Sequence, residues 1–263
     1  EYIKNNNNTL SKNLNNYYKS VIDMNPKTYS KKLAIEAEKQ VEQFFTNKDP
    51  WEMLAFYNRD EMLCNQAPFT WSLNPDDKDV NKYRSYISSH QFEIIDLNVY
   101  FDDGTDVAYK KKYREAYRKN VKKIFNISLG KNNYNPQDVY DVEVELFNVF
   151  DCNEIGISDE NYNKVYTKES MTKYGFDWEI LSKHLGFKKT PEFFITNSLN
   201  YLKCGSDLFL KNWNTPKWKT YWLYILLKRI VRITSGWEDI IYDFKGNFER
   251  GQEVINRVNS VSA

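Results

Sequence analysis

The chain has 263 residues, of which 41% are hydrophobic and 28% are charged. This length and composition exclude a disordered tail, because such a chain can bury a sizeable apolar core as one large domain or two small ones. Lys and Arg number 37 against 36 Asp and Glu, a formal net charge of +1. This balance excludes a molecule-wide field that would attract nucleic acid or anionic lipid, so any such binding would need a local patch.

Residues 1–12 are polar and rich in Asn. We expect them to form a disordered lead, because they offer little apolar surface to offset the entropy cost of ordering. Residues 13–263 are expected to fold as a single lobe. In that lobe, apolar residues at helical spacing predict helices from about residue 30 to residue 48, over 51–63 and over 106–128.

Asn135, Thr190 and Thr215 each precede a proline, and a capping side chain followed by Pro is a typical helix start. These signals predict helices over residues 136–150, 192–201 and 217–233. The run at 221–233 is the most apolar of the chain, but it is too short to span a bilayer and contains Lys228 and Arg229. We interpret it as a buried helix, and the sequence predicts no membrane span.

Residues 69–88 have a different pattern. FTWSL and YRSYIS alternate between apolar and polar residues, and the NPDDKD between them is dense in turn formers. This pattern predicts a β-hairpin, which is the one strand-like feature that the sequence suggests. The expected fold class is therefore mainly α, a multi-helix lobe with one short hairpin near residues 69–88.

Candidate metal ligands are few. His90 and His184 are the only histidines, and neither stands in an H-E-x-x-H or H-x-H pattern that could bring two imidazoles to one metal. We interpret both as structural or surface residues. Cys64, Cys152 and Cys204 show no C-x-x-C spacing, so we interpret them as free thiols rather than as a zinc site or a disulfide framework.

Candidate acid/base pairs are Glu143 with Glu145 and Asp102 with Asp103. The two glutamates stand two apart on a predicted helix and so point in different directions, while FDDG is ordinary turn chemistry. The nucleophile-elbow, P-loop and dinucleotide motifs are also absent from the sequence. The sequence therefore gives no catalytic, cofactor-binding or metal residue, and no cofactor for this chain.

A basic stretch could bind nucleic-acid phosphates, because its cations are interleaved with tyrosines. The tyrosines fall on the apolar stripe of the predicted helix, which favours a solvated basic face with aromatic residues packed inward. Nucleic acid is therefore not the expected partner and is kept as a second alternative. The cations are Lys110, Lys111, Lys112, Arg114, Arg118, Lys119, Lys122 and Lys123.

Three stretches, in this order, resemble the amino-terminal region of the neprilysin and endothelin-converting-enzyme family of zinc metallopeptidases. The first is the hairpin at 69–88 with its Asp76-Asp77-Lys78 turn, the second is residues 139–178, and the third is residues 190–230. The residues that match in the second and third stretches are Tyr162, Asn163, Thr167, Asp177, Trp178 and Trp222.

The resemblance implies a mostly helical lobe that roofs a thermolysin-like catalytic lobe and encloses a cavity for peptides. The family's zinc ligands and catalytic glutamate lie further along its chains, so none of its functional residues has a counterpart here. The implied function is the non-catalytic lobe of such a peptidase, with zinc and proteolysis in a lobe absent from this chain. Whether the chain is part of an enzyme stays open at this point. The implied partners are that lobe or another protein chain, and a peptide substrate where the lobe is present.

One alternative is a catalytically inactive scaffold, for example a structural protein in the particle of a large DNA virus. The family's extracellular disulfides have no evident counterpart among three scattered cysteines. A cytoplasmic or virion location is therefore expected in preference to secretion.

Overall fold

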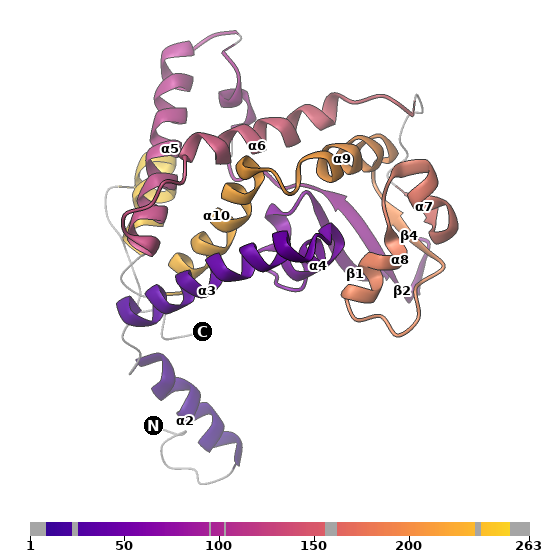
Figure 1. The fold of residues 1–263 in the computed structure, drawn as a ribbon, viewed down its shortest axis with the longest axis horizontal. Helices are drawn as coiled ribbons and strands as arrows, with labels where there is room; N and C mark the ends of the chain where they lie inside the picture. The colour runs from indigo at the N-terminus through magenta and orange to yellow at the C-terminus, as the bar shows by residue number, and fades with distance from the viewer. Residues whose placement is uncertain are drawn as a thin grey trace.

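The computed structural model describes residues 9–22, 26–94, 96–102, 104–155, 162–234 and 238–252. Within these ranges the protein is mainly helical with a small sheet, which confirms the expected fold class (Figure 1). The helices are α2 (Thr9–Ile22), α3 (Pro26–Asn47), α4 (Pro50–Asn58), α5 (Val107–Leu129), α6 (Pro136–Asn148), α7 (Thr167–Tyr174), α8 (Trp178–His184), α9 (Leu199–Asn212), α10 (Pro216–Ile233) and α11 (Glu238–Tyr242). Short 3₁₀ turns η1 (Cys64–Gln66), η2 (Leu97–Tyr100) and η3 (Val149–Asp151) and the π-helical turn η4 (Asp243–Phe248) complete the helical elements.

Helix α10 forms the centre of the core. Trp218, Trp222 and Leu227 are completely buried, and buried side chains occur on every side of the helix. Helices α3, α5 and α6 pack around it (Figure 1). The Tyr57 hydroxyl of α4 donates a hydrogen bond to the Trp222 carbonyl oxygen at 2.7 Å. The predicted buried helix is therefore confirmed. In the described part of the chain, no helix is both long and apolar enough to cross a membrane.

Two of the three predicted cap-and-proline starts are confirmed. The Asn135 side chain accepts a hydrogen bond from the Gln137 backbone N–H at 3.1 Å, and the Thr215 hydroxyl oxygen accepts one from the Trp218 backbone N–H at 3.4 Å. A proline follows each cap in the first turn. Helices α6 and α10 begin there because the cap partners an otherwise unsatisfied N–H and the proline has none to leave unpaired.

The third predicted start, at Thr190, is wrong. A strand, β4 (Phe193–Thr196), follows it, and helix α9 begins only at Leu199, where the Ser198 hydroxyl oxygen accepts from the Tyr201 backbone N–H at 3.1 Å. The FFIT run is aromatic and β-branched, which suits a strand that has neighbours to pair with.

The sheet contains the predicted hairpin and two further strands. β1 (Phe69–Asp76) and β2 (Asp79–Ser89) are antiparallel, with Phe69 opposite Ser89. β4 runs parallel to β2, and β3 (Asn163–Tyr166) runs antiparallel to β4, so the strand order is β1-β2-β4-β3. The hairpin is confirmed, but the expectation that it is the only strand feature is wrong. The sequence did not indicate β3 and β4, because each is too short to show a clear alternation of apolar and polar residues.

The expected lead is also partly helical. Residues 1–8 lie outside the described residues, whereas residues 9–12 form the start of α2. The Asn-rich composition suggested disorder. Apolar residues at Leu10, Leu14, Tyr17 and Tyr18 nevertheless have the spacing of one helix face.

Candidate functional site

The two histidines have different structural partners. His90 is buried, and its Nδ1 lies 3.3 Å from the Ala67 carbonyl oxygen. Burial lowers the pKa of His90 to about 4, so the imidazole is neutral near pH 7. His184 Nε2 lies 2.9 Å from the carboxylate of Asp49, which caps α4. Among the described residues neither histidine belongs to a group of three potential metal ligands, so they do not fit a histidine-based zinc site.

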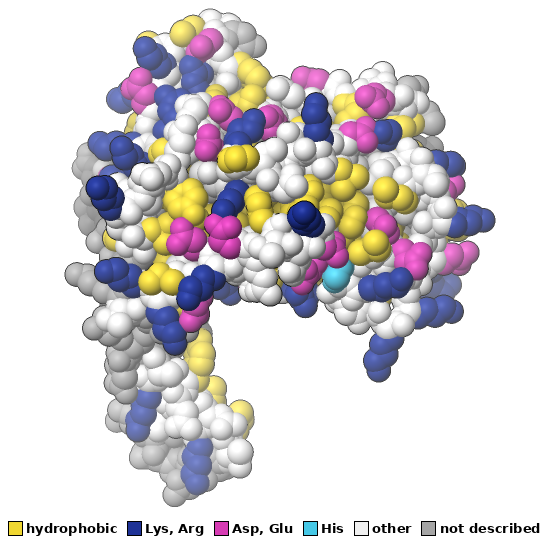
Figure 2. All heavy atoms as spheres, in the orientation of Figure 1, with side chains coloured by type: hydrophobic (Ala, Val, Ile, Leu, Met, Phe, Trp, Pro, Cys, Tyr) yellow, Lys and Arg dark blue, Asp and Glu magenta, His cyan; other side chains and the backbone are white. Residues whose placement is uncertain are grey.

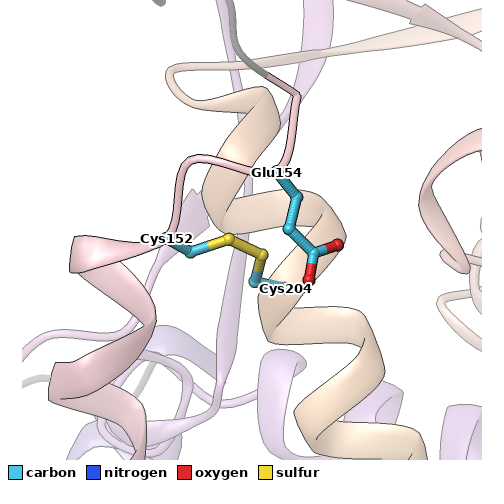
Figure 3. A group of neighbouring side chains, drawn as sticks. All are labelled: Cys152, Glu154 and Cys204. Carbon is cyan, nitrogen blue, oxygen red and sulfur yellow. A yellow bond between two sulfur atoms is a disulfide. The ribbon is translucent and has the colours of Figure 1, made fainter.

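One group of potential metal ligands does occur in the described ranges. Cys152, Glu154 and Cys204 have ligand atoms within 4.8 Å of one another (Figure 3). They line an open depression of about 470 Å³ between the segment after η3 and helix α9. The two sulfur atoms are joined in a disulfide, however. Only the Glu154 carboxylate is therefore left to bind a cation, and the group as it stands is a structural crosslink.

The expectation of three free thiols is wrong for Cys152 and Cys204, while Cys64 is free. The two partners stand 52 residues apart in the sequence, and only the packing of η3 against α9 brings them together. Spacing along the chain carries no signal for such a pair. The disulfide also removes the observation on which the expected cytoplasmic or virion location rested.

Glu143 is buried in the core. Its two carboxylate oxygens accept hydrogen bonds from the Tyr100 hydroxyl at 2.6 Å and from the Tyr117 hydroxyl at 2.7 Å. Burial raises the pKa of Glu143 to about 7, and the negative charge of Glu93 acts in the same direction. Such a carboxyl group could exchange a proton near pH 7, but it lies inside the core rather than in a cleft.

Glu145 has separate partners. Its carboxylate pairs with Lys217 and accepts a hydrogen bond from the Trp218 indole N–H at 2.9 Å. The two glutamates therefore face different surroundings, as expected for positions two apart on α6. They do not form an acid/base pair.

Glu93 carries a buried carboxylate that the sequence analysis did not identify as a candidate site residue. It is buried, and its carboxylate contacts Lys228 at 2.5 Å, Lys245 at 3.9 Å and the Tyr224 hydroxyl at 3.2 Å. Burial alone would raise the pKa of Glu93, but the two ammonium groups outweigh it and lower the pKa. The partners come from α10 and η4, far along the chain, so no local pattern marks this network.

The basic helix α5 packs its aromatic side inward. Tyr113 and Tyr117 are buried, which leaves neither ring free to stack on a base. Arg114 pairs with Asp102 and also donates to backbone carbonyl oxygens of the η2 segment. Asp102 is thus a structural partner, and Asp103 lies outside the described residues. The interpretation of α5 as a solvated basic face with inward aromatic residues is therefore confirmed only in part: Tyr113 and Tyr117 point inward, but Tyr109 is 52% exposed, and Lys110 and Arg114 of the expected basic face are buried.

The turn of the hairpin is held by Asp76. Its carboxylate accepts hydrogen bonds from the Lys78 backbone N–H at 2.9 Å, from the Tyr162 hydroxyl at 2.7 Å and from Arg84 Nε at 3.1 Å. The Lys78 backbone bond, followed by the Tyr162 bond, lowers the pKa of Asp76 to about 2. The turn motif therefore ties the hairpin to the segment that enters β3.

Other motif residues are also structural. Asp177 caps α8 by accepting a hydrogen bond from the Ile180 backbone N–H at 2.9 Å, and Trp178 is completely buried. Thr167 is the first residue of α7 and is not its N-cap. Instead its hydroxyl donates to the Pro191 carbonyl oxygen at 2.6 Å and so joins the start of α7 to the segment before β4.

On the face drawn in Figure 2, side chains of both charge signs are interspersed over the body, and apolar side chains gather between α4 and α9. No extended field of one sign covers this face of the described residues. This agrees with the net charge near zero and gives no support for a nucleic-acid surface here.

Comparison with known proteins places these features in one family. The model of peptidase family M13 matches residues 1–261. The fold is similar to that of the zinc metalloprotease Zmp1 of Mycobacterium tuberculosis in complex with an inhibitor, with a TM-score of 0.55 and 16% identity over 91% of this chain and 42% of that chain. Zmp1 in its open state gives a TM-score of 0.53 and 15% identity, over 91% of this chain and 43% of that chain.

At identities this low, the similarity shows a shared fold and does not show a shared function. The chain spans less than half of the length of these metalloproteases. No curated protein sequence matches it significantly.

Proposed function

The chain belongs to peptidase family M13, and we propose that it is the non-catalytic helical lobe of a zinc metallopeptidase that roofs a peptide-binding cavity. The observation that carries this proposal is the fold match, which covers 91% of this chain but only 42% of a zinc metalloprotease. The family match agrees with the resemblance of the hairpin and of residues 139–178 and 190–230. In this reading, zinc and the proteolytic residues belong to a catalytic lobe outside this chain.

The roles of the side chains support a lobe whose contribution is structural and not catalytic. The matching motif residues, Asp76, Asp177 and Trp178, hold a turn, a helix start and the core. Across the described ranges, the one group of three potential metal ligands has its two sulfurs in a disulfide. Nothing in this part of the chain favours the scaffold or the nucleic-acid alternative.

The test compares this chain alone with the longer protein that contains it and its peptidase lobe. We expect zinc-dependent hydrolysis of short peptides by the longer protein, loss of activity with a chelator, and recovery on adding zinc. The chain alone should show none. A roofed cavity further predicts that a folded protein substrate is cleaved much more slowly than a peptide of the same cleavage sequence. Hydrolysis by the chain alone, or a parent protein without an H-E-x-x-H motif, would contradict the proposal.

A further inference from the structure

Cys152, Glu154 and Cys204 extend toward one another from two segments of the chain (Figure 3). The first two belong to the segment after η3, and Cys204 belongs to α9. Two sulfur atoms and a carboxylate oxygen thus lie within 4.8 Å of one another. The closed disulfide occupies both sulfurs, whereas reduction would free two thiols, which bind zinc as thiolates. The group therefore has a second chemical state in which three ligands are free.

The spacing of these ligands suits one zinc ion. Zinc binds sulfur at about 2.3 Å in a tetrahedral arrangement, so two thiolates on one ion stand about 3.8 Å apart. The Cα atoms of Cys152 and Cys204 are 6.5 Å apart, a distance that side-chain rotation can bridge to such an ion. No movement of η3 relative to α9 is required.

The two segments are also held together by contacts other than the disulfide. The Ile155 backbone N–H donates a hydrogen bond to the Asn200 side-chain oxygen at 2.8 Å, and the ring centroids of Phe150 and Tyr201 lie 4.9 Å apart. These contacts flank Cys152 on both sides, and Asn200 stands one helical turn before the other cysteine on the same face of α9. The sulfurs therefore stay near each other after reduction.

The surroundings favour a cation with an affinity for sulfur. The charged side chains that line the depression of about 470 Å³ are Glu145 and Glu154, both acidic. Glu145 is already paired with Lys217, whereas Glu154 is exposed and has no ion pair or hydrogen bond among the described residues. Two sulfurs and one carboxylate suit zinc rather than magnesium or calcium, which prefer oxygen ligands alone. The fourth position of a tetrahedral ion is left open to solvent.

We propose that reduction converts the Cys152–Cys204 crosslink into a zinc site formed by two thiolates and the Glu154 carboxylate. A small dithiol supplies the two electrons. One of its sulfurs attacks the protein disulfide, the other displaces it as a cyclic disulfide, and both cysteines are left as thiols. Zinc then replaces their two protons, which pass to solvent.

The joint between η3 and α9 is thereby held by a covalent bond under oxidising conditions and by a metal ion under reducing conditions. All three ligands belong to this chain. The site is therefore separate from the peptidase zinc of the proposed function and does not depend on it.

Cobalt titration tests the site in the 263-residue chain, whose described residues form their own core. Cys64→Ser first removes the free thiol. The protein is reduced with a dithiol, freed of dithiol and metal without oxygen, and titrated with Co²⁺, which substitutes for zinc and reports thiolate ligands by a sulfur-to-cobalt absorption band. We expect a band that saturates at one cobalt per chain and disappears when zinc is added. The oxidised protein should give no band.

Two matched variants test the carboxylate ligand. Glu154→Gln should weaken cobalt binding about tenfold or more, because it removes a charged ligand. Asp151→Asn removes the same charge from an exposed residue beside Cys152 that is outside the ligand group, and it should change the affinity about twofold or less, since solvent and salt screen such a charge. Cys204→Ser should abolish the band.

Several outcomes would overturn the proposal. The reduced protein might give no band, or the band could saturate at one cobalt for every two chains, which would place the ligands in different molecules. Equal effects of Glu154→Gln and Asp151→Asn would exclude the carboxylate, and a band that persists in Cys204→Ser would exclude the cysteine pair.

Thermal unfolding gives an independent readout. Zinc should raise the unfolding midpoint of the reduced protein, because an ion that binds only the folded chain stabilises it, and should leave the oxidised protein unchanged. An equal rise in both states would show that zinc binds elsewhere, and this result would also refute the proposed site.

Discussion

Trp178 is a single residue whose packing stabilises the fold. It is completely buried, with its ring centroid 5.3 Å from that of Phe194 and 6.0 Å from that of Phe187. Its indole N–H has no hydrogen-bond partner among the described residues, so its contribution is packing. The residue thus joins α8 to β4 and to the loop between them.

We predict that Trp178→Ala lowers the free energy of unfolding by about 3–5 kcal/mol. The variant loses the favourable free energy of transferring the indole ring from water into the core, and it leaves a cavity. Lys111→Ala, on the exposed basic face, should change it by about 0.5 kcal/mol or less. Trp178→Phe should be milder than Trp178→Ala, since it keeps a ring and removes the unpartnered N–H. Denaturant titrations followed by circular dichroism measure all three. Equally mild effects of the two alanine variants would show that Trp178 is exposed.

Glu143 makes stability depend on pH. Its pKa rises from an ordinary value of 4.5 to about 7 because the carboxyl is buried. The folded chain therefore holds this proton more tightly than the unfolded chain, and between these pH values it binds more protons. The stability that Glu143 contributes consequently falls as pH rises through this window and levels off above it, whereas His90, whose pKa is lowered from 6.5 to about 4, contributes a dependence of opposite sign between those two values. Asp76, whose pKa is lowered to about 2, titrates below the window.

Glu143→Gln should remove this dependence. We predict that wild type loses stability relative to Glu143→Gln between about pH 5 and pH 8, by no more than about 1.4 kcal/mol for each pH unit. The comparison requires urea titrations of both proteins at a series of pH values. Parallel curves would mean that the carboxyl is solvated in the folded protein.

At the scale of elements, the sheet and the disulfide join parts of the chain that local chemistry leaves separate. β4 lies between β2 and β3 and so connects the hairpin to the carboxyl-terminal half. Cys152 and Cys204 fasten the end of η3 to α9. Caps such as Asn135 and Thr215 were predictable, because a cap acts on backbone groups two or three residues away. The strand character of β4 was not, since its partners lie elsewhere in the sequence.

The disulfide yields an element-scale prediction. In a Cys64→Ser background, Cys204→Ser should lower the free energy of unfolding by about 2–4 kcal/mol, because closing a loop between positions 52 residues apart restricts the unfolded chain. Reduction of the unsubstituted disulfide should produce a similar loss. Thermal unfolding with and without reductant measures it, and an unchanged midpoint on reduction would show that the pair is not oxidised in solution.

For the molecule as a whole, we predict that this chain holds no stoichiometric zinc when its disulfide is closed. His90 and His184 have separate structural partners, and the two sulfur atoms near Glu154 are bonded to each other. Dialysis against a chelator should therefore leave the unfolding midpoint unchanged. Elemental analysis that found one zinc per chain, lost in His90→Ala or His184→Ala, would reveal a site that the described residues do not show.

The sequence by itself determined the helical class, the hairpin at 69–88, the buried helix α10 and the absence of a histidine-based zinc motif. Each depends on periodicity, capping or turn chemistry among residues close in the chain. Its ordered motifs also pointed to the family. Only the tertiary structure decided the Cys152–Cys204 disulfide, the Glu93 network, the pairing of β4 and the exposed face of α2. These features depend on which distant segments meet, and that is settled by packing of the whole core rather than by any local pattern.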